Sequence, residues 1–148
     1  MSQLYYRQLL ERIELFRNLS VEDVERIFTK GMTMHVPKGS VIFYQNTTGN
    51  TMFVILAGKV DLYSKDQRIA TLGTGDTMGE MALISEEPRS ATAIASEDTN
   101  LFVLSETTFQ RLMTKRVAVQ MLLNIIGTLS KRLRDTNKKL SEAKRRDG

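Results

Sequence analysis

The sequence has no cysteine and no tryptophan, and its 148 residues include one histidine and two prolines. Without cysteine, neither a disulfide nor thiolate chemistry is available. The single histidine, His35, has no second imidazole with which to build a usual zinc site. Its place in an alternating segment puts it on the less apolar face of a strand. We therefore expect no metal centre and an ordinary surface role for His35.

Long hydrophobic segments are also absent. No apolar run approaches the about 18 residues of a membrane-spanning helix. The first residues, MSQLYYRQLLERIE, lack the apolar region of a secretory signal peptide. Together with the lack of cysteine, these absences predict a cytoplasmic protein without a membrane partner.

Positive charge is concentrated towards the C-terminus. The segment from Lys131 to Gly148 holds eight Lys or Arg and three acidic residues, so it carries +5 while residues 1–130 carry −1. We expect a solvated helix end whose cations suit the helix dipole. Contact with nucleic acid or an anionic lipid is the alternative, and we expect no nucleic-acid partner for this chain alone.

The length and composition, with 41% hydrophobic and 26% charged residues, predict one globular domain over residues 1–148. Residues 3–30 have the apolar spacing of helices, and Ser20 followed by acidic residues is typical of a helix start. Residues 31–105 contain about seven short alternating segments separated by turns, which indicates a small barrel or sandwich. Residues 106–146 are helical again, so the fold class is α+β.

The stretch from Gly73 to Ala95, GTGDTMGEMALISEEPRSATAIA, contains the residues best suited to bind a ligand. Its three spaced glycines let the backbone approach a ligand, because glycine has no Cβ. The segment Met81-Ala82-Leu83-Ile84 predicts one or two helical turns whose first amides attract an anion. Pro88 ends that helix, and Arg89 follows at the start of a new strand.

The same loop therefore offers amide donors, the Glu80 carboxylate and the Arg89 guanidinium. A phosphate would bind the amides and Arg89, which can donate two parallel hydrogen bonds. Glu80 would repel a phosphate, so its expected task is to accept a hydrogen bond from a hydroxyl. A ribose cyclic phosphate satisfies both residues. The alternative is an ordinary corner between a helix and a strand, with a solvated arginine and glutamate.

The pattern GEMALI…PRSATA resembles the phosphate-binding cassette of the cyclic-nucleotide-binding domain family. That family includes catabolite activator proteins, protein kinase A regulatory subunits and cyclic-nucleotide-gated channels. The resemblance covers about residues 12–140 and implies an antiparallel, jelly-roll-like β-roll flanked by N-terminal helices and a long C-terminal helix. It implies that Glu80 binds the ribose 2′-hydroxyl and that Arg89 binds the phosphate oxygens. The other cassette residues implied to bind the ligand are Gly79, Met81, Ala82 and Ser90.

A long helix is predicted from about Arg116 to about Ala143. Its seam positions are spaced alternately by three and four residues, as in a coiled coil. They are Val119, Leu122, Ile126, Leu129, Leu133, Thr136 and Leu140. No other predicted helix has a matching length, so the expected partner is a second copy in a twofold dimer. Packing on the β-roll is the alternative, and the two can hold for different halves of the helix.

Thr136 is a polar residue at a seam position, and such residues usually set the register or meet a ligand. The segment KRLRDTNKKL resembles the end of the dimerisation helix in catabolite activator proteins. There, hydroxyl residues of the two chains contact the adenine ring. The resemblance implies that Thr136, and Asn137 from the opposite subunit, reach the base. A threonine that only sets the register is the alternative.

The implied function is a regulatory module that binds a cyclic nucleotide and transmits the signal through the long helix. Ser90 is the form found in catabolite activators and implies cAMP, although a serine could also serve cGMP. The alternatives are a dimerisation scaffold that has lost the nucleotide and the sensor fragment of a DNA-binding transcription regulator. We do not expect an enzyme, because Glu80, Glu86 and Glu87 have no second group of matching role near them in sequence.

Overall fold

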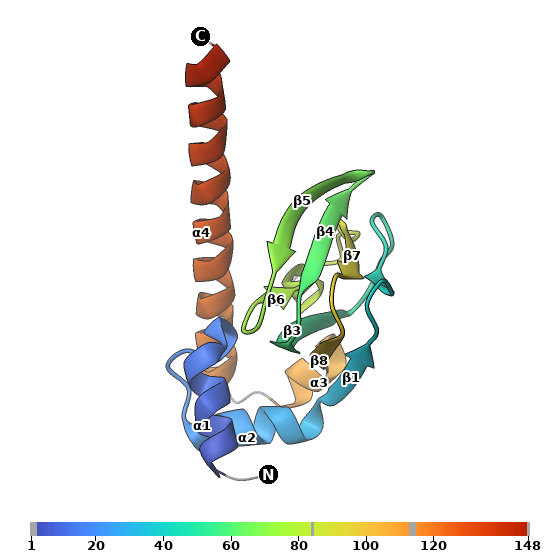
Figure 1. Cartoon of the computed structure of the whole chain (residues 1–148). Helices are drawn as coiled ribbons and strands as arrows, with labels where there is room; N and C mark the ends of the chain where they lie inside the picture. Colours follow the sequence, from blue (N-terminus) through green and yellow to red (C-terminus); the bar gives the residue numbers. More distant parts are fainter. Residues whose placement is uncertain (1–2, 84, 113–114, 148) are drawn as a thin grey trace.

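The structure is a computed structural model that describes residues 3–83, 85–112 and 115–147. Figure 1 shows a β-roll of two sheets, with shorter helices at one end and the long helix α4 along one side. All strand pairs are antiparallel. The predicted α+β class and antiparallel β-roll are confirmed. None of the described helices combines the length and apolarity needed to cross a membrane.

Three short helices precede the β-roll: α1 (Gln3–Arg12), the 3₁₀ helix η1 (Glu14–Phe16) and α2 (Val21–Lys30). Ser20 caps α2, as the sequence predicts. Its hydroxyl accepts a hydrogen bond from the Asp23 amide at 3.1 Å, and the Asp23 carboxylate accepts one from the Ser20 amide at 3.2 Å. This reciprocal pair is a capping box and fixes the residue at which α2 begins.

Within the described residues, eight strands form two four-stranded sheets. The sheet of order β1-β8-β3-β6 consists of β1 (Met32–Val36), β8 (Thr99–Ser105), β3 (Thr51–Ala57) and β6 (Thr77–Met78). The sheet of order β2-β7-β4-β5 consists of β2 (Val41–Phe43), β7 (Thr92–Ala95), β4 (Val60–Ser64) and β5 (Gln67–Leu72). Strand β6 was not predicted from the sequence, because two residues in a glycine-rich loop show no alternation and only their pairing with β3 defines the strand.

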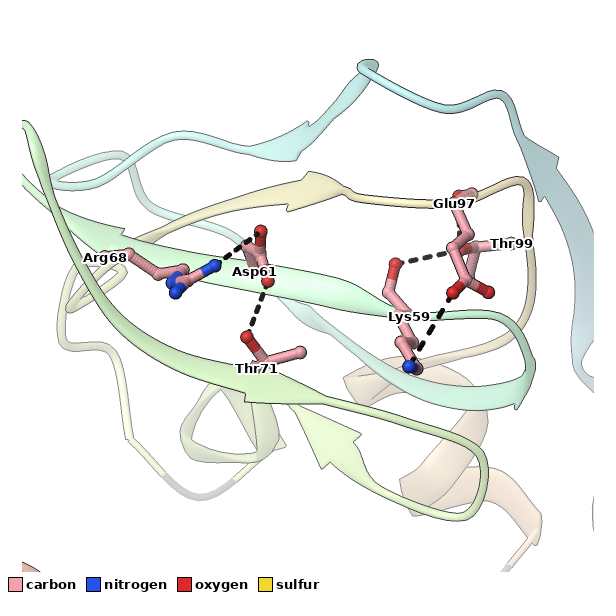
Figure 2. Close-up of polar contacts among 6 residues, drawn as sticks. All are labelled: Lys59, Asp61, Arg68, Thr71, Glu97 and Thr99. Atoms are coloured by element: carbon pink, nitrogen blue, oxygen red, sulfur yellow. Dashed lines mark hydrogen bonds and ion pairs between the residues drawn. The ribbon is translucent and has the colours of Figure 1, made fainter.

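Polar contacts fix the hairpin of β4 and β5, as Figure 2 shows. Asp61 of β4 accepts a hydrogen bond from the Thr71 hydroxyl at 2.7 Å and lies 3.9 Å from the Arg68 guanidinium, both on β5. Just before β4, the Lys59 carbonyl accepts a hydrogen bond from the Thr99 hydroxyl at 3.1 Å. These contacts set the position of β4, which contributes to the pocket described below.

Strand β3 supplies side chains to two hydrophobic cores. Met52 and Val54 belong to a core shared with the N-terminal helices and α4, whereas Phe53 and Ile55 belong to the core inside the β-roll. The apolar run of β3 predicts a strand covered on both faces, and the burial of these four side chains confirms it. The first core therefore attaches the helices to the roll.

Helix α3 (Glu106–Leu112) is followed by α4 (Lys115–Asp147), which confirms the predicted long helix. Val117, Met121 and Ile125 recur at every fourth residue and pack into the first core. This spacing brings them to one face of the helix. The C-terminal end of α4 extends past the β-roll in Figure 1.

The exposed apolar side chains of α4 correct the predicted seam. Leu122 is half-buried, and Leu129 packs against the first core. Leu123, which the prediction left out, is 56% exposed. The exposed stripe, as we call it below, consists of Val119, Leu123, Ile126, Leu133 and Leu140. The prediction chose Leu122 over Leu123 wrongly, because adjacent leucines suit either of two helix faces and only packing on the roll distinguishes them. Leu129 packs on the roll, which is the alternative that the sequence left open for part of the helix.

Candidate functional site

A pocket of about 290 Å³ lies between the β-roll and α4. Six residues predicted from the sequence line it together: Gly79, Glu80, Met81, Ala82, Arg89 and Ser90. Further lining residues are Phe43 and Leu62 of the roll and Leu129 and Arg132 of α4. These four were not predicted from the sequence as site residues, because they come from segments far from the cassette.

The cassette begins with a 3₁₀ helix, η2 (Glu80–Leu83). It corresponds to the predicted helix over Met81–Ile84, of which Ile84 lies outside the described residues. The Ala82 amide donates a hydrogen bond to the Gly79 carbonyl at 3.0 Å. That amide is already engaged, so a ligand would have to share it. The group of this loop best suited to an anion is therefore a side chain, that of Arg89.

Glycine is required at two positions of this loop. Gly79 has a φ of +72°, and a Cβ there would clash with Nη1 of Arg89. Gly75 has a φ of +91°, but a Cβ there would clash with the carbonyl oxygen of Arg12 at the end of α1. The close approach expected of Gly75 is thus to the N-terminal helix and not to a ligand.

The backbone of Arg89 is held by the loop that follows β2. The Asn46 amide donates to the Arg89 carbonyl at 2.8 Å, and the Arg89 amide donates to the Thr47 carbonyl at 2.8 Å. The adjacent Gln45 amide donates to the Thr92 hydroxyl at 2.9 Å. These bonds fix the backbone from which the guanidinium extends, just before β7 begins.

The Arg89 residue is only 8% exposed. Its Nη2 donates to the Thr51 carbonyl at 2.8 Å and to the Thr51 hydroxyl at 3.3 Å, and its Nη1 donates to the Gly79 carbonyl at 3.3 Å. Within the part of the chain that the structure describes, no carboxylate lies at ion-pair distance from it. Burial lowers the pKa of Arg89, and the negative charge of Glu80 opposes that shift. Since arginine keeps its proton in proteins, the site holds a cation surrounded by neutral oxygens.

Glu80 is 3% exposed, and its carboxylate is paired with α4. Nη1 of Arg132 donates to Oε1 of Glu80 at 2.6 Å, and Nη2 donates to the Thr77 carbonyl at 2.7 Å. The pair therefore connects the long helix directly to the cassette. The only sequence signal for Arg132 was its place one helical turn before Thr136, in a segment already linked to the ligand by resemblance.

Two residues predicted to bind the ligand do not line the pocket. Thr136 and Asn137 are exposed on α4. The Thr136 hydroxyl donates to the Arg132 carbonyl at 2.9 Å, as is common for threonine inside a helix. Asn137 is predicted to act from the opposite subunit, so the contacts of both residues with a base stay a prediction.

The site combines a buried cation with a buried carboxylate, and both line one pocket. The cation suits an anion, and the carboxylate suits a hydrogen-bond donor such as a hydroxyl. His35 lies outside this site, with Nδ1 2.8 Å from the Asn100 side-chain oxygen. Among the described residues, no cluster of three or more His, Cys, Asp or Glu could hold a metal ion.

Comparisons with known proteins agree with this chemistry. Residues 33–116 match the family model described as cyclic nucleotide-binding domain. The chain is 33% identical over 131 residues to the cyclic AMP receptor protein of Thermus thermophilus, covering 85% of this chain and 60% of that protein. It is 29% identical over 119 residues to the cAMP-dependent protein kinase regulatory subunit of Candida albicans, covering 80% of this chain and 24% of that protein. It thus spans less than two thirds of the length of both relatives.

A solved cyclic nucleotide-binding domain from Methylobacillus flagellatus has the same fold. The TM-score is 0.81 at 26% sequence identity, over 93% of this chain and 83% of that one. The likeness therefore covers nearly the whole chain.

Proposed function

Because the chain belongs to the cyclic nucleotide-binding domain family, we propose that its pocket binds a 3′,5′-cyclic nucleotide and that the protein is a regulatory sensor. The proposed ligand is cAMP, with cGMP as the second candidate. The Thermus relative is named as a receptor for cyclic AMP and the Candida relative as part of a cAMP-dependent kinase. Ser90, which follows the cassette arginine, is consistent with cAMP.

The observation that carries this proposal is the state of Arg89. Its guanidinium is buried and lines the pocket, yet its hydrogen-bond partners among the described residues are the neutral oxygens of Thr51 and Gly79. Removing a charge from water without a counter-charge is costly. A ligand phosphate would supply that counter-charge through charge-assisted hydrogen bonds. The scaffold alternative is disfavoured because it predicts the loss of Glu80 or Arg89, and both are present.

Glu80 gives the site its second specificity. A carboxylate on the wall of a phosphate pocket repels an ordinary phosphate, but it can accept a hydrogen bond from a ribose hydroxyl. Oε1 already accepts from Arg132, and a carboxylate has capacity for further donors. The proposed contacts of the ribose and phosphate are therefore Glu80 and Arg89, with Gly79, Met81, Ala82 and Ser90 around them.

Signal transmission would follow from the Glu80–Arg132 pair. The Glu80 carboxylate holds α4 against the cassette through Arg132. A ribose hydroxyl that binds Glu80 changes the environment of this carboxylate. The nucleotide can shift the position of α4 only by its difference in affinity for the two arrangements. We propose that α4 carries the signal, and that residues 1–148 act as one cytoplasmic, non-catalytic domain. The sensor part of a DNA-binding regulator is the second candidate.

We propose that α4 also pairs with α4 of a second copy through the exposed stripe. Together with Ser130 and Asn137, the stripe has the alternating four- and three-residue spacing of a coiled coil. The seam is then Val119, Leu123, Ile126, Ser130, Leu133, Asn137 and Leu140. A monomer would leave this apolar surface in water.

The polar seam residues favour parallel, in-register helices. In that arrangement Asn137 faces Asn137 of the second copy, and the two amides can hydrogen-bond. In antiparallel arrangements of the same seam, Asn137 faces an apolar residue such as Ile126 or Leu133, and its amide is buried without a partner. Parallel pairing also places Asn137 of the second copy near Thr136, as the base contact predicted from the sequence requires.

The dimer has a direct test. Ile126→Lys with Leu133→Lys buries charge in the seam and should give a monomer in sedimentation equilibrium. The control is Asp135→Lys with Glu142→Lys, which adds more positive charge to exposed positions outside the seam and should leave the dimer intact. Because the chain has no cysteine, Asn137→Cys should cross-link to itself on oxidation if the helices are parallel. A dimer that survives the paired lysines does not use this seam.

Nucleotide binding is tested by titration calorimetry with cAMP, cGMP and linear AMP. We expect a cyclic nucleotide to bind and Arg89→Ala to weaken it by about 2–5 kcal/mol, since the change removes the buried partner of the phosphate. The control is Arg68→Ala, because Arg68 is exposed on β5 and does not line the pocket. Equal affinity of the Arg89→Ala variant and the parent would show that the cassette assignment is wrong.

A further inference from the structure

The guanidinium of Arg89 lies over an aromatic ring. Its Cζ atom is 4.6 Å from the centroid of the Phe43 ring and 5.8 Å from that of Phe53. The two rings stack on each other, with centroids 5.8 Å apart and planes inclined by 29°. Both distances are within the range of cation–π attraction. Phe53 is buried in the β-roll core, whereas Phe43 is half-buried and lines the pocket.

The strand geometry explains how Phe43 reaches this position. Phe43 is the last residue of β2 and pairs with Ala93 of β7, the strand that follows Arg89. The register of β2 on β7 shifts between Val41 and Phe43. Irregularities of this kind redirect side chains at sheet edges and near binding sites. The loop that holds the Arg89 backbone begins directly after β2.

A ring and a carboxylate would stabilise this cation in different ways. A carboxylate would bind the guanidinium more strongly, but it would also neutralise the charge and repel a phosphate. The face of an aromatic ring attracts a cation through its quadrupole and carries no net charge. The contacts of Arg89 with Thr51 and Gly79 are likewise with neutral oxygens. All these contacts hold the guanidinium in place while its full charge stays available to a ligand.

We propose that Phe43 is a positioning residue for the anion site: its ring orients the Arg89 guanidinium and stabilises its charge without neutralising it. This inference rests on the proposed function, since it concerns the same phosphate. A leucine at position 43 would keep most of the apolar volume and lose the quadrupole. A tyrosine would keep both.

The test compares Phe43→Leu with Phe43→Tyr by calorimetry with cAMP, after the thermal unfolding of each variant has been recorded. We expect Phe43→Leu to lower the affinity about 3- to 30-fold, the range of a partly desolvated cation–π contact. Phe43→Tyr should stay within about threefold of the parent. Tyr44→Leu is the matched control, because Tyr44 is the neighbouring aromatic residue, is exposed, and does not line the pocket.

A double-mutant cycle separates this role from simple packing. In the Arg89→Ala background, Phe43→Leu should change the affinity less than about twofold, because the group it orients is gone. A purely structural role predicts the same loss in both backgrounds. If Phe43→Leu does not fold, fluorinated phenylalanines at position 43 keep the shape and weaken the quadrupole. The affinity should then fall stepwise with each added fluorine.

The outcomes distinguish the two proposals. If the parent protein binds no cyclic nucleotide, both the proposed function and the role of Phe43 are wrong. If the parent binds and Arg89→Ala weakens it, but Phe43→Leu or the fluorinated series has no effect, the function stands and the role of Phe43 is refuted.

Discussion

Two arginines of this protein meet their surroundings in opposite ways. The Arg116 side chain at the start of α4 is 65% exposed, and its Nη2 donates to both oxygens of the buried Asp23 carboxylate, at 2.9 and 3.1 Å. Arg89 is buried, and no carboxylate of the described residues lies at ion-pair distance from it. The first arginine neutralises a charge of the fold. The second carries a charge that the fold leaves unneutralised, and this difference separates a structural ion pair from a binding site.

The Asp23 site is complete without a ligand. Burial alone would raise the pKa of Asp23, but the hydrogen bonds from Arg116 and from Ser20 outweigh burial, so the pKa lies below its ordinary value. A carboxylate with a depressed pKa stabilises the fold above its unfolded pKa of about 3.9. That stabilisation is lost as the pH falls through the folded pKa.

Arg116→Ala should have the larger effect on stability. We expect a loss of about 1–2 kcal/mol in the free energy of unfolding at pH 7, because Asp23 keeps only its bonds to Ser20. The difference from the parent should shrink below about pH 4, where the carboxylate becomes protonated. Urea titrations between about pH 3 and pH 8 measure both effects. Arg26→Ala is the control, since Arg26 is an exposed arginine on α2. A pH-independent difference would contradict this account.

Arg89→Ala should have the smaller effect on stability, although it has the larger effect on binding. Without ligand, the guanidinium loses hydration and gains only neutral partners, so its removal should change the free energy of unfolding by about 1 kcal/mol or less. The same urea titrations test this, and saturating cAMP should then stabilise the parent but not the variant. A loss larger than that of Arg116→Ala would mean that Arg89 is chiefly a structural residue.

The cassette could be predicted from the sequence because its residues are close together in the chain. Glu80 and Arg89 lie in one loop, so their residue types and the proline between them describe the local chemistry directly. The structure brings both into one pocket with the other four cassette residues. The capping box of α2 and the doubly covered strand β3 were likewise local patterns.

The residues that complete the site could not be predicted. Arg132 and Glu80 are 52 positions apart in the sequence. Phe43 and Arg89 likewise come from separate segments of the chain, and only the fold places the ring against the guanidinium. In an isolated helix, Arg132 is one of many cations in a basic segment. Its pairing with Glu80 exists only because Val117 and Met121 attach α4 to the first core at one rotation about the helix axis.

The sequence by itself determined the local chemistry: which loop carries the cation and the carboxylate, which segments are helix or strand, and that α4 has more apolar surface than its own roll requires. Hydrogen bonding and side-chain period act over a few residues, so they can be read from neighbours in the chain. The tertiary structure decided which leucines of α4 remain exposed, which arginine reaches Glu80 and which ring supports Arg89. Those choices depend on the packing of distant segments, because packing selects one rotation and one register from several that the sequence pattern permits.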